Sequence, residues 1–282
     1  MLKLRITTAL ILIPLVIAGI FYLSQRYFIW ITALLTLLAA WEWSRLSSWT
    51  DLKKRLLYIG FQCIILLFLI GISIRQWMLV FGLIFWCLLA IYLLWARTKR
   101  VLPTIPIYVR VSSGWLILTL CWAALQVLHQ TPFYLLFMLL IIWLADTTAY
   151  ASGRLWGQHL LAPLLSPKKT WEGLIIGLLV TFFVAILIQY CFKGAKPFLW
   201  QTFILVLLTS FAAVAGDLFE SQLKRLEKLK DSGHLLPGHG GLLDRIDSLL
   251  AAAPVFVGSL LLLGLPSNPS ALSISCGYHH FV

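Results

Sequence analysis

Residues 173–192, GLIIGLLVTFFVAILIQYCF, form a long and mostly apolar run that contains no charged side chain. About 20 such residues are enough to cross the hydrocarbon core of a bilayer as an α-helix. Within lipid the backbone must satisfy its own hydrogen bonds, so only helices and closed barrels span membranes. The run is too long and too uniformly apolar for a barrel strand, and we therefore predict a transmembrane helix.

Eight further segments of the chain have the same character. Of the 282 residues, 61% are hydrophobic and 11% are charged, whereas soluble domains have about 45–50% and about 25%. The sequence therefore predicts an all-α polytopic membrane protein with about nine transmembrane helices. The predicted spans are residues 6–24, 27–44, 56–74, 77–96, 111–128, 132–150, 172–192, 198–217 and 247–265.

The basic residues predict how these helices are oriented. If the N-terminus is cytoplasmic and the spans alternate, every Lys and Arg falls on the cytoplasmic side except Arg26, Arg75, Lys193 and Lys196. This asymmetry follows the positive-inside rule, and all ten acidic residues lie on or near the same side. The first apolar run is long enough to span and has no clear cleavage site, so we expect a retained helix rather than a signal peptide.

This orientation also accounts for the net charge of +12. The basic residues lie in short segments between apolar runs and not along one face of a compact domain, so we expect no nucleic-acid partner. Lipid of the surrounding membrane is the expected partner instead. We predict an integral protein of a bacterial inner (cytoplasmic) membrane, with its N-terminus and active site in the cytoplasm.

The distribution of polar residues divides the chain into three parts. Residues 1–130 contain the first five predicted helices, and residues 131–265 contain the last four. The second part includes two polar loops, 150–171 and 217–247, which we expect to be cytoplasmic and catalytic. Residues 266–282 form a polar tail to which we assign no function. The five cysteines form no CxxC pair and are predicted to act as small hydrophobic residues.

The first polar loop and its lead-in carry one carboxylate and a pair of lysines. Asp146 lies near the end of a predicted apolar helix, where an ionisable residue usually faces a polar interior; a helix-end carboxylate at the interface is the alternative. Lys168 and Lys169 are suited to phosphate, although a plain positive flank would look the same. Ser166 and Thr170 add hydroxyl groups, and Thr170 is placed to cap the next helix.

The second polar loop is the most densely charged part of the chain. Residues 221–247, SQLKRLEKLKDSGHLLPGHGGLLDRID, contain nine charged side chains. If the preceding helix continues through this segment, one helix face is shared by Asp217, Ser221, Lys224 and Lys228. We therefore predict a polar helix face at the cytoplasmic end of the eighth span.

The end of this loop combines glycines with carboxylates. Gly240 and Gly241 allow backbone N–H groups to approach an anion, and Asp244 and Asp247 follow at the start of the last span. Carboxylates hold Mg²⁺ through one or two ligands plus substrate phosphates, while Lys and Arg neutralise the remaining phosphate charge. The pattern favours a nucleoside triphosphate with Mg²⁺. His239 fits a phosphate contact, a role in proton transfer or a plain loop residue. Zinc is disfavoured because no cysteine is near.

This stretch resembles the signature of the membrane-bound phosphatidate cytidylyltransferases, also called CDP-diacylglycerol synthases. That signature is S-x-x-K-R-x-x-x-x-K-D-x-x-x-x-x-P-x-H-G-G-x-x-D-R-x-D. It is matched by Ser221, Lys224, Arg225, Lys230, Asp231, Pro237, His239, Gly240, Gly241, Asp244, Arg245 and Asp247. The segments 146–150, 166–173 and 216–221 are also similar to the family, so the resemblance covers residues 140–260, and the first five spans match only in character.

The resemblance implies synthesis of CDP-diacylglycerol and pyrophosphate from CTP and phosphatidic acid. It implies a paired-metal site that includes Asp217 and Asp244, with Mg²⁺ and a second ion of unspecified identity, and it implies a homodimer. Asp247, Lys224 and Arg225 are the other expected catalytic residues. Substrate contacts are expected from Asp146, Ser166, Lys168, Lys169, Thr170, Ser221, Lys230, Asp231, His239, Gly240, Gly241 and Arg245.

Two other classes of membrane protein share some of these features. A transporter would also have many spans and intramembrane carboxylates, but here the carboxylates cluster at one face and no inverted repeat is visible. A CDP-alcohol phosphotransferase would share the lipid and Mg²⁺ chemistry. Its pattern D-G-x-x-A-R…G-x-x-x-D-x-x-x-D is absent from this chain.

Overall fold

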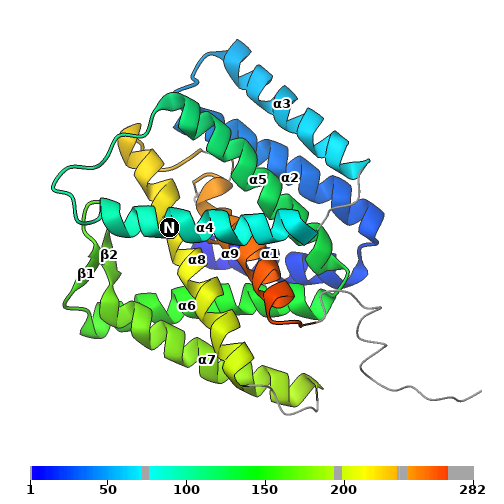
Figure 1. The fold of residues 1–282 in the computed structure, drawn as a ribbon, viewed down its shortest axis with the longest axis vertical. Helices are drawn as coiled ribbons and strands as arrows, with labels where there is room; N and C mark the ends of the chain where they lie inside the picture. Colours follow the sequence, from blue (N-terminus) through cyan, green and yellow to red (C-terminus); the bar gives the residue numbers. More distant parts are fainter. Residues whose placement is uncertain (1, 72–75, 194–198, 234, 236–239, 266–282) are drawn as a thin grey trace, which may run out of the picture.

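The computed structural model describes residues 2–71, 76–193, 199–233, 235 and 240–265 (Figure 1). Nine helices run through these residues, and each overlaps one predicted span, which confirms the predicted fold class. Within the described residues, seven of these helices are long and apolar enough to cross a membrane. The helices are α1 (Leu2–Tyr22), α2 (Gln25–Leu46), α3 (Leu52–Ile70), α4 (Gln76–Ala96), α5 (Ile107–His129), α6 (Pro132–Trp156), α7 (Trp171–Lys193), α8 (Leu199–Leu226) and α9 (Leu243–Leu262).

Two helices extend beyond the hydrophobic runs that predicted them. Helix α6 continues to Trp156, so Asp146 lies ten residues before its end and not at its end as expected. Helix α8 continues to Leu226, which confirms that the eighth helix carries on into the charged loop. Hydropathy ends a predicted span where the side chains become polar, but the backbone hydrogen bonds of a helix continue through polar residues.

A short β-hairpin in the first polar loop was not predicted. Strand β1 (Leu160–Ala162) pairs with β2 (Ser166–Thr170) in an antiparallel arrangement, with Leu160 opposite Thr170 and Ala162 opposite Ser166. Figure 1 shows the hairpin at one edge of the bundle, beside the packed pair α6 and α7. Its second strand leads directly into α7, so it determines where the two loop lysines lie.

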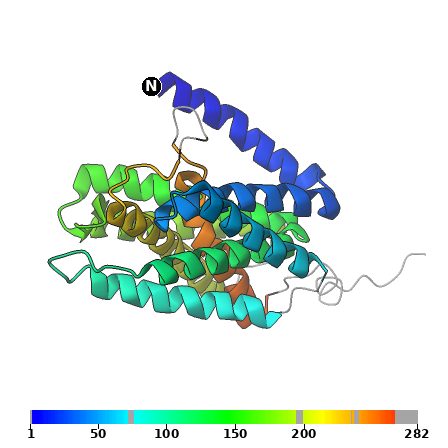
Figure 2. The same ribbon diagram turned by 90° about the horizontal axis from the view of Figure 1, so that it is seen from above.

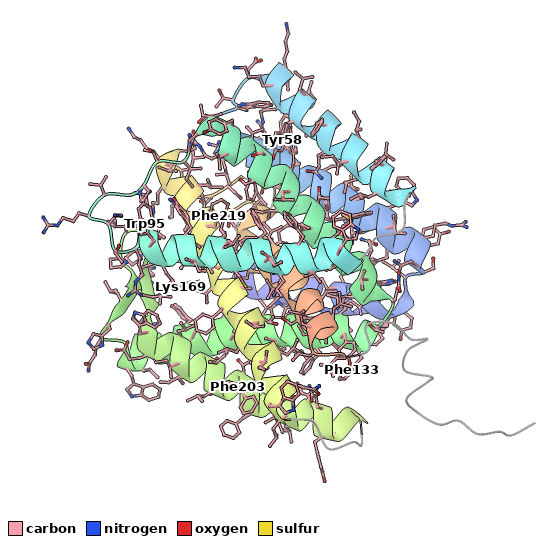
Figure 3. All side chains as sticks on the ribbon, viewed as in Figure 1. Tyr58, Trp95, Phe133, Lys169, Phe203 and Phe219 are labelled. Carbon is pink, nitrogen blue, oxygen red and sulfur yellow. The ribbon has the colours of Figure 1, made fainter. Side chains whose placement is uncertain are left out.

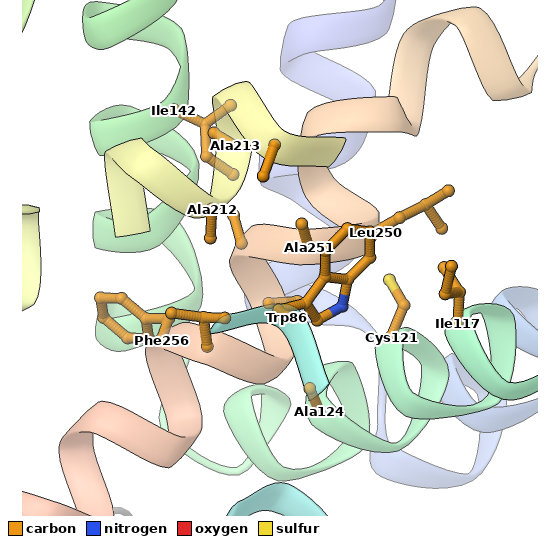
Figure 4. Packing of buried hydrophobic residues seen from close by; sticks show 14 of the residues in the cluster. Trp86, Ile117, Cys121, Ala124, Ile142, Ala212, Ala213, Leu250, Ala251 and Phe256 are labelled. Atoms are coloured by element: carbon orange, nitrogen blue, oxygen red, sulfur yellow. The ribbon is translucent and has the colours of Figure 1, made fainter. Parts of the chain in front are cut away.

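Helix α9 lies at the centre of the helix bundle. It packs against α8, α4, α5 and α6, and its residues 250–260 are all buried. Figure 4 shows Ala251 and Phe256 of this helix among Trp86 of α4 and Cys121 of α5. The buried residues of α9 include Ala251, Ala252, Ala253 and Gly258. Small residues such as these permit helices of a membrane protein to approach one another closely. Figure 2 shows that α1, in contrast, extends away from the bundle towards its N-terminus.

We expect Gly114→Ala to destabilise the contact between α2, α3 and α5. A Cβ at Gly114 would lie closer than 3.0 Å to Trp43 Nε1 and to the Tyr58 hydroxyl. Both groups donate hydrogen bonds to backbone carbonyls of α5, at 2.9 and 3.2 Å, so neither can move without losing its bond. Overpacking of this kind costs about 1–3 kcal/mol. Thermal unfolding in detergent would measure the loss.

Gly60→Ala in α3 is the matched control, because a Cβ there would meet no atom within 4 Å. Alanine is the better helix former of the two residues, so this variant should unfold at the wild-type temperature or slightly above it. Equal unfolding temperatures for the two variants would contradict the proposed steric cause.

Candidate functional site

A cavity of about 310 Å³ lies between α6, α7, α8, α9 and the hairpin. Side chains from the two polar loops meet here, although α7 separates those loops along the chain. Seven of the predicted site residues line the cavity: Asp146, Ser166, Lys168, Lys169, Thr170, Asp217 and Asp247. The apolar part of the lining includes Ala145, Ala149, Leu161, Leu174, Leu178 and Val214.

Lys169, labelled in Figure 3, joins the hairpin to α8. Its ammonium group forms an ion pair with Asp217 Oδ2, and its side chain is only 24% exposed. Burial by itself lowers the pKa of Lys169, but the nearby carboxylates of Asp217, Asp146 and Asp247 outweigh burial and place the pKa above its ordinary value. Lys169 therefore remains a cation at neutral pH, inside a cavity lined by three carboxylates.

Thr170 follows Lys169 and confirms the predicted helix cap. Its Oγ1 accepts a hydrogen bond from the backbone N–H of Gly173 at 3.2 Å, in the first turn of α7. Such a bond satisfies one of the N–H groups that have no partner within the helix. The cap fixes the end of strand β2 at the start of α7, and Lys168 and Lys169 belong to this strand.

Asp244 lies in the first turn of α9, and both of its carboxylate oxygens are hydrogen-bonded. Oδ1 accepts from Lys224 Nζ at 2.8 Å. Oδ2 accepts from the backbone N–H of Ser232 at 2.9 Å, from its hydroxyl at 3.0 Å, and from the N–H of Gly241 at 2.8 Å. Asp244 therefore ties the loop 231–241 to α8. Ser232 was not among the predicted site residues.

The expected polar face of α8 is present as far as Lys224, but the helix ends at Leu226, so Lys228 does not belong to this face as predicted. Ser221 Oγ donates to Asp217 Oδ1 at 3.3 Å, one helical turn apart. On the facing helix, Asp247 Oδ1 accepts from the Ser248 N–H at 2.7 Å, and Ser248 Oγ donates to Asp146 Oδ2 at 3.3 Å. The bond from Ser248 connects α9 to α6, and the bond from Lys224 to Asp244 connects α9 to α8.

Glu220 belongs to the same region and was missed by the sequence analysis as a site residue. It is 1% exposed, and neither of its oxygens accepts a hydrogen bond from any residue that the structure describes. Lys224 Nζ lies 3.4 Å from Oε1, and Asp247, Asp244 and Asp217 are within range of electrostatic interaction. Its position three residues after Asp217, on a predicted helix face, is the signal that identifies it.

The carboxylates of this region fit a cation without forming a ready-made cage. Within the described residues, no group of three or more His, Cys, Asp or Glu side chains is placed to hold a metal ion. The expected ligands Asp217 and Asp244 face Lys169 and Lys224 instead. However, two ammonium groups share the region with five carboxylates, those of Asp146, Asp217, Glu220, Asp244 and Asp247. Such an excess of carboxyl groups over ammonium groups offers oxygen ligands that suit Mg²⁺, which takes one or two carboxylates together with substrate phosphates.

The two predicted loop glycines have structural reasons of their own. Gly240 has φ +83°, a left-handed conformation that favours glycine. The N–H of Gly241 is already bonded to Asp244, and a Cβ at Gly241 would lie 2.5 Å from Glu42 Oε2. That these glycines let the backbone approach phosphate stays a prediction.

Four further predicted residues do not line the cavity: Arg225, Lys230, Asp231 and Arg245 are exposed at the surface of the described structure. His239 lies outside the described residues, as do Pro237 and the C-terminal tail 266–282. The structure thus brings together the upstream loop, α8 and the start of α9, and leaves these four charged residues of the signature facing outward.

Glu42 of α2 is the second site residue that the sequence analysis missed. It is 3% exposed and accepts hydrogen bonds from the backbone N–H groups of Leu242 and Leu243 at the start of α9. Its place inside the predicted span 27–44 is the signal that identifies it, because an ionisable residue within a span usually has a function.

Known proteins resemble this chain along most of its length. Residues 3–263 match the model of the family described as "Cytidylyltransferase family". A phosphatidate cytidylyltransferase of Pseudomonas aeruginosa is 34% identical, over 94% of this chain and 98% of the relative. One from Haemophilus influenzae is 33% identical, over 91% and 97%. One from Staphylococcus saprophyticus is 45% identical over 122 residues, which are 43% of this chain and 46% of the relative.

Proposed function

The chain belongs to the cytidylyltransferase family, and from this we propose that it transfers the cytidylyl group of CTP to phosphatidic acid, forming CDP-diacylglycerol and releasing pyrophosphate. Membership makes the chain a nucleotidyltransferase. Two relatives that match over nearly their whole length are named for this activity. The observation that carries the proposal is the cavity whose lining combines lysines and carboxylates with aliphatic side chains.

The polar and apolar lining residues suit the two parts of phosphatidic acid. Lys168 and Lys169 offer compact positive charges to a phosphate group. Leu174, Leu178 and Val214 lie on membrane-spanning helices and offer apolar side chains to the beginning of an acyl chain. A lipid whose tails stay in the bilayer could thus present its phosphate to the lysines of the cavity.

The proposed reaction requires little covalent chemistry from the protein. An oxygen of the phosphatidic acid phosphate attacks the α-phosphorus of CTP in line. The bond from that phosphorus to the oxygen that bridges to the β-phosphate breaks, and pyrophosphate leaves with the bonding electrons. A phosphate monoester has a second pKa of about 6 and is largely dianionic at neutral pH, so we assign no essential base, and His239 is not required as one.

The contribution of the protein is positioning and charge neutralisation. Lys169 and Lys224 now neutralise Asp217 and Asp244, and each is placed to contact phosphate oxygens when substrate is bound. Asp217 and Asp244 would hold Mg²⁺, with Asp247 in support. Bound Mg²⁺ would neutralise further phosphate charge and polarise the reacting phosphate.

We also propose the location of the reaction. The bacterial relatives and the charge asymmetry of the loops favour the inner membrane, with the N-terminus and the active site in the cytoplasm. CTP would then reach the lysines and carboxylates of the cavity directly from the cytoplasm. The basic residues that flank the helices would attract anionic lipid. A homodimer is proposed from the family resemblance alone.

The proposal is tested with the purified protein in detergent, supplied with phosphatidic acid, Mg²⁺ and CTP labelled at the α-phosphorus. We expect the label in a lipid product, whereas a label at the γ-phosphorus should leave with pyrophosphate. Omission of phosphatidic acid should abolish the lipid label. A requirement for CDP-lipid and an alcohol in place of CTP would indicate a phosphotransferase. Solute uptake into proteoliposomes without CTP turnover would indicate a transporter. Either result would refute the proposal.

A further inference from the structure

A tertiary contact caps the N-terminus of α9. The first N–H groups of any helix lack partners within the helix, and Leu242, which precedes α9, offers no side-chain cap. Glu42 Oε1 accepts from the N–H of Leu242 at 3.0 Å, and Oε2 accepts from the N–H of Leu243 at 2.8 Å. A carboxylate 200 residues away in the sequence therefore takes the place of a local cap, where the helix dipole favours negative charge.

The same carboxylate is linked to Asp244 through one hydroxyl group. Ser232 Oγ lies 3.1 Å from Glu42 Oε2 and 3.0 Å from Asp244 Oδ2. A serine hydroxyl has a single hydrogen, so the two carboxylates share this donor. The position of Glu42 and the orientation of Asp244 are therefore coupled through Ser232.

Two glycines of the loop are packed closely against Glu42 and Ser232. A Cβ at Gly233 would lie closer than 3.0 Å to Glu42 Oε1. A Cβ at Gly241 would lie closer than 3.0 Å to Ser232 Oγ and 2.5 Å from Glu42 Oε2. Any side chain at either position would displace the carboxylate or the loop. The close packing of these glycines and the hydrogen bonds of Glu42 are two separate observations, and both indicate that the loop is fitted to the Glu42 carboxylate.

We infer that Glu42, in the N-terminal half of the chain, is a positioning residue for the catalytic loop: it caps α9 and so holds Asp244 in the orientation that the reaction uses. Charge-assisted bonds of this kind are about twice as strong as neutral ones. Because Glu42 occupies the N-terminal amides of α9, which would otherwise attract phosphate, neutralisation of the substrate is left to the lysines. The catalytic part of the inference rests on the proposed function, but the capping part does not.

The test compares Glu42→Gln with Glu227→Gln. Glu227 is a matched carboxylate immediately after α8. It also links the two halves of the chain, through an ion pair with Arg110 and a bond from Ser48 Oγ at 2.6 Å, and it does not line the cavity. Glutamine keeps the size of the side chain but turns one acceptor oxygen into a donor. We expect only Glu42→Gln to affect the loop and the reaction.

Two quantities are measured for each variant. Hydrogen exchange of the amides of Leu242 and Leu243 should be about tenfold faster or more in Glu42→Gln, with exchange in the middle of α9 unchanged. The kcat for CDP-diacylglycerol formation should fall about 10–100-fold, while the KM for phosphatidic acid stays at the wild-type value. Glu42→Asp keeps the charge and should recover part of kcat.

Exchange and kcat at wild-type values in Glu42→Gln would overturn the inference, and so would an equal loss of kcat in Glu227→Gln. If Glu42→Gln does not fold, Gly241→Ala disturbs the same contact from the loop side and should give both effects; wild-type behaviour of that variant would equally overturn the inference. If wild-type protein makes no CDP-diacylglycerol, the proposed function fails, and the exchange rates still decide whether Glu42 caps α9.

Discussion

Asp217→Asn should lower kcat for CDP-diacylglycerol formation by about 10²–10³-fold, the size of effect seen when one preorganised electrostatic group is removed from an active site. Asparagine has nearly the same shape and can still accept the Ser221 hydrogen bond. It loses the charge that pairs with Lys169 and that would hold a cation beside the reacting phosphates. Initial rates at saturating phosphatidic acid, with CTP and Mg²⁺ varied separately, would measure the loss.

Asp51→Asn is a suitable control for this experiment, because Asp51 is an exposed acidic residue before α3 and lies outside the cavity. It should retain the wild-type rate. If Asp217→Asn kept more than about a tenth of the wild-type kcat, an effect well below that of removing such a group, Asp217 would have no essential role in the reaction. The contrast with Asp244 is informative, since Asp244 also accepts three bonds from the loop, and its replacement should disturb the loop as well as the reaction.

Lys169→Met should both destabilise and inactivate the protein. The ammonium group of Lys169 is the cation that faces Asp217, Asp146 and Asp247, and methionine leaves these carboxylates without it. Removal of one partner from a buried ion pair costs about 3–5 kcal/mol, and we expect the lower end because the Lys169 side chain is 24% exposed. Thermal unfolding in detergent, together with the activity of the protein that remains folded, would measure both losses.

Lys168→Met is the matched control for stability, because the neighbouring Lys168 is exposed; its unfolding temperature should equal that of the wild type. Lys169→Arg keeps the charge and should recover part of the stability. Equal unfolding temperatures for Lys169→Met and Lys168→Met would show that the Lys169 ion pair contributes nothing to the folded state.

The dependence on pH follows from the raised pKa of Lys169. A lysine whose pKa is higher in the folded than in the unfolded state stabilises the protein fully below the unfolded value, about 10.4, and this stabilisation is lost as the pH rises through the folded value. The difference in unfolding temperature between wild type and Lys169→Met should therefore persist from pH 7 to 9. It should shrink only above about pH 10.4.

The elements that the sequence predicts correctly are those whose determining interactions are local. Residues 173–192 lack charge over a span of bilayer length, and the structure places α7 there. The Thr170 cap, which depends on residues three apart, is also confirmed. The hairpin 160–170 was missed, because its strands are too short to show a period of alternating side chains.

The sequence by itself determined that the chain is a helical membrane protein and, through the match of residues 221–247, which family it belongs to. Both follow from short segments, since a helix in lipid must satisfy its backbone within about 20 residues and a signature is read in order along the chain. Only the tertiary structure decided that Lys169 pairs with Asp217 across α7 and that Glu42 caps α9. These contacts join residues far apart in the sequence, and they depend on how whole helices pack, which the pattern of any one segment does not specify.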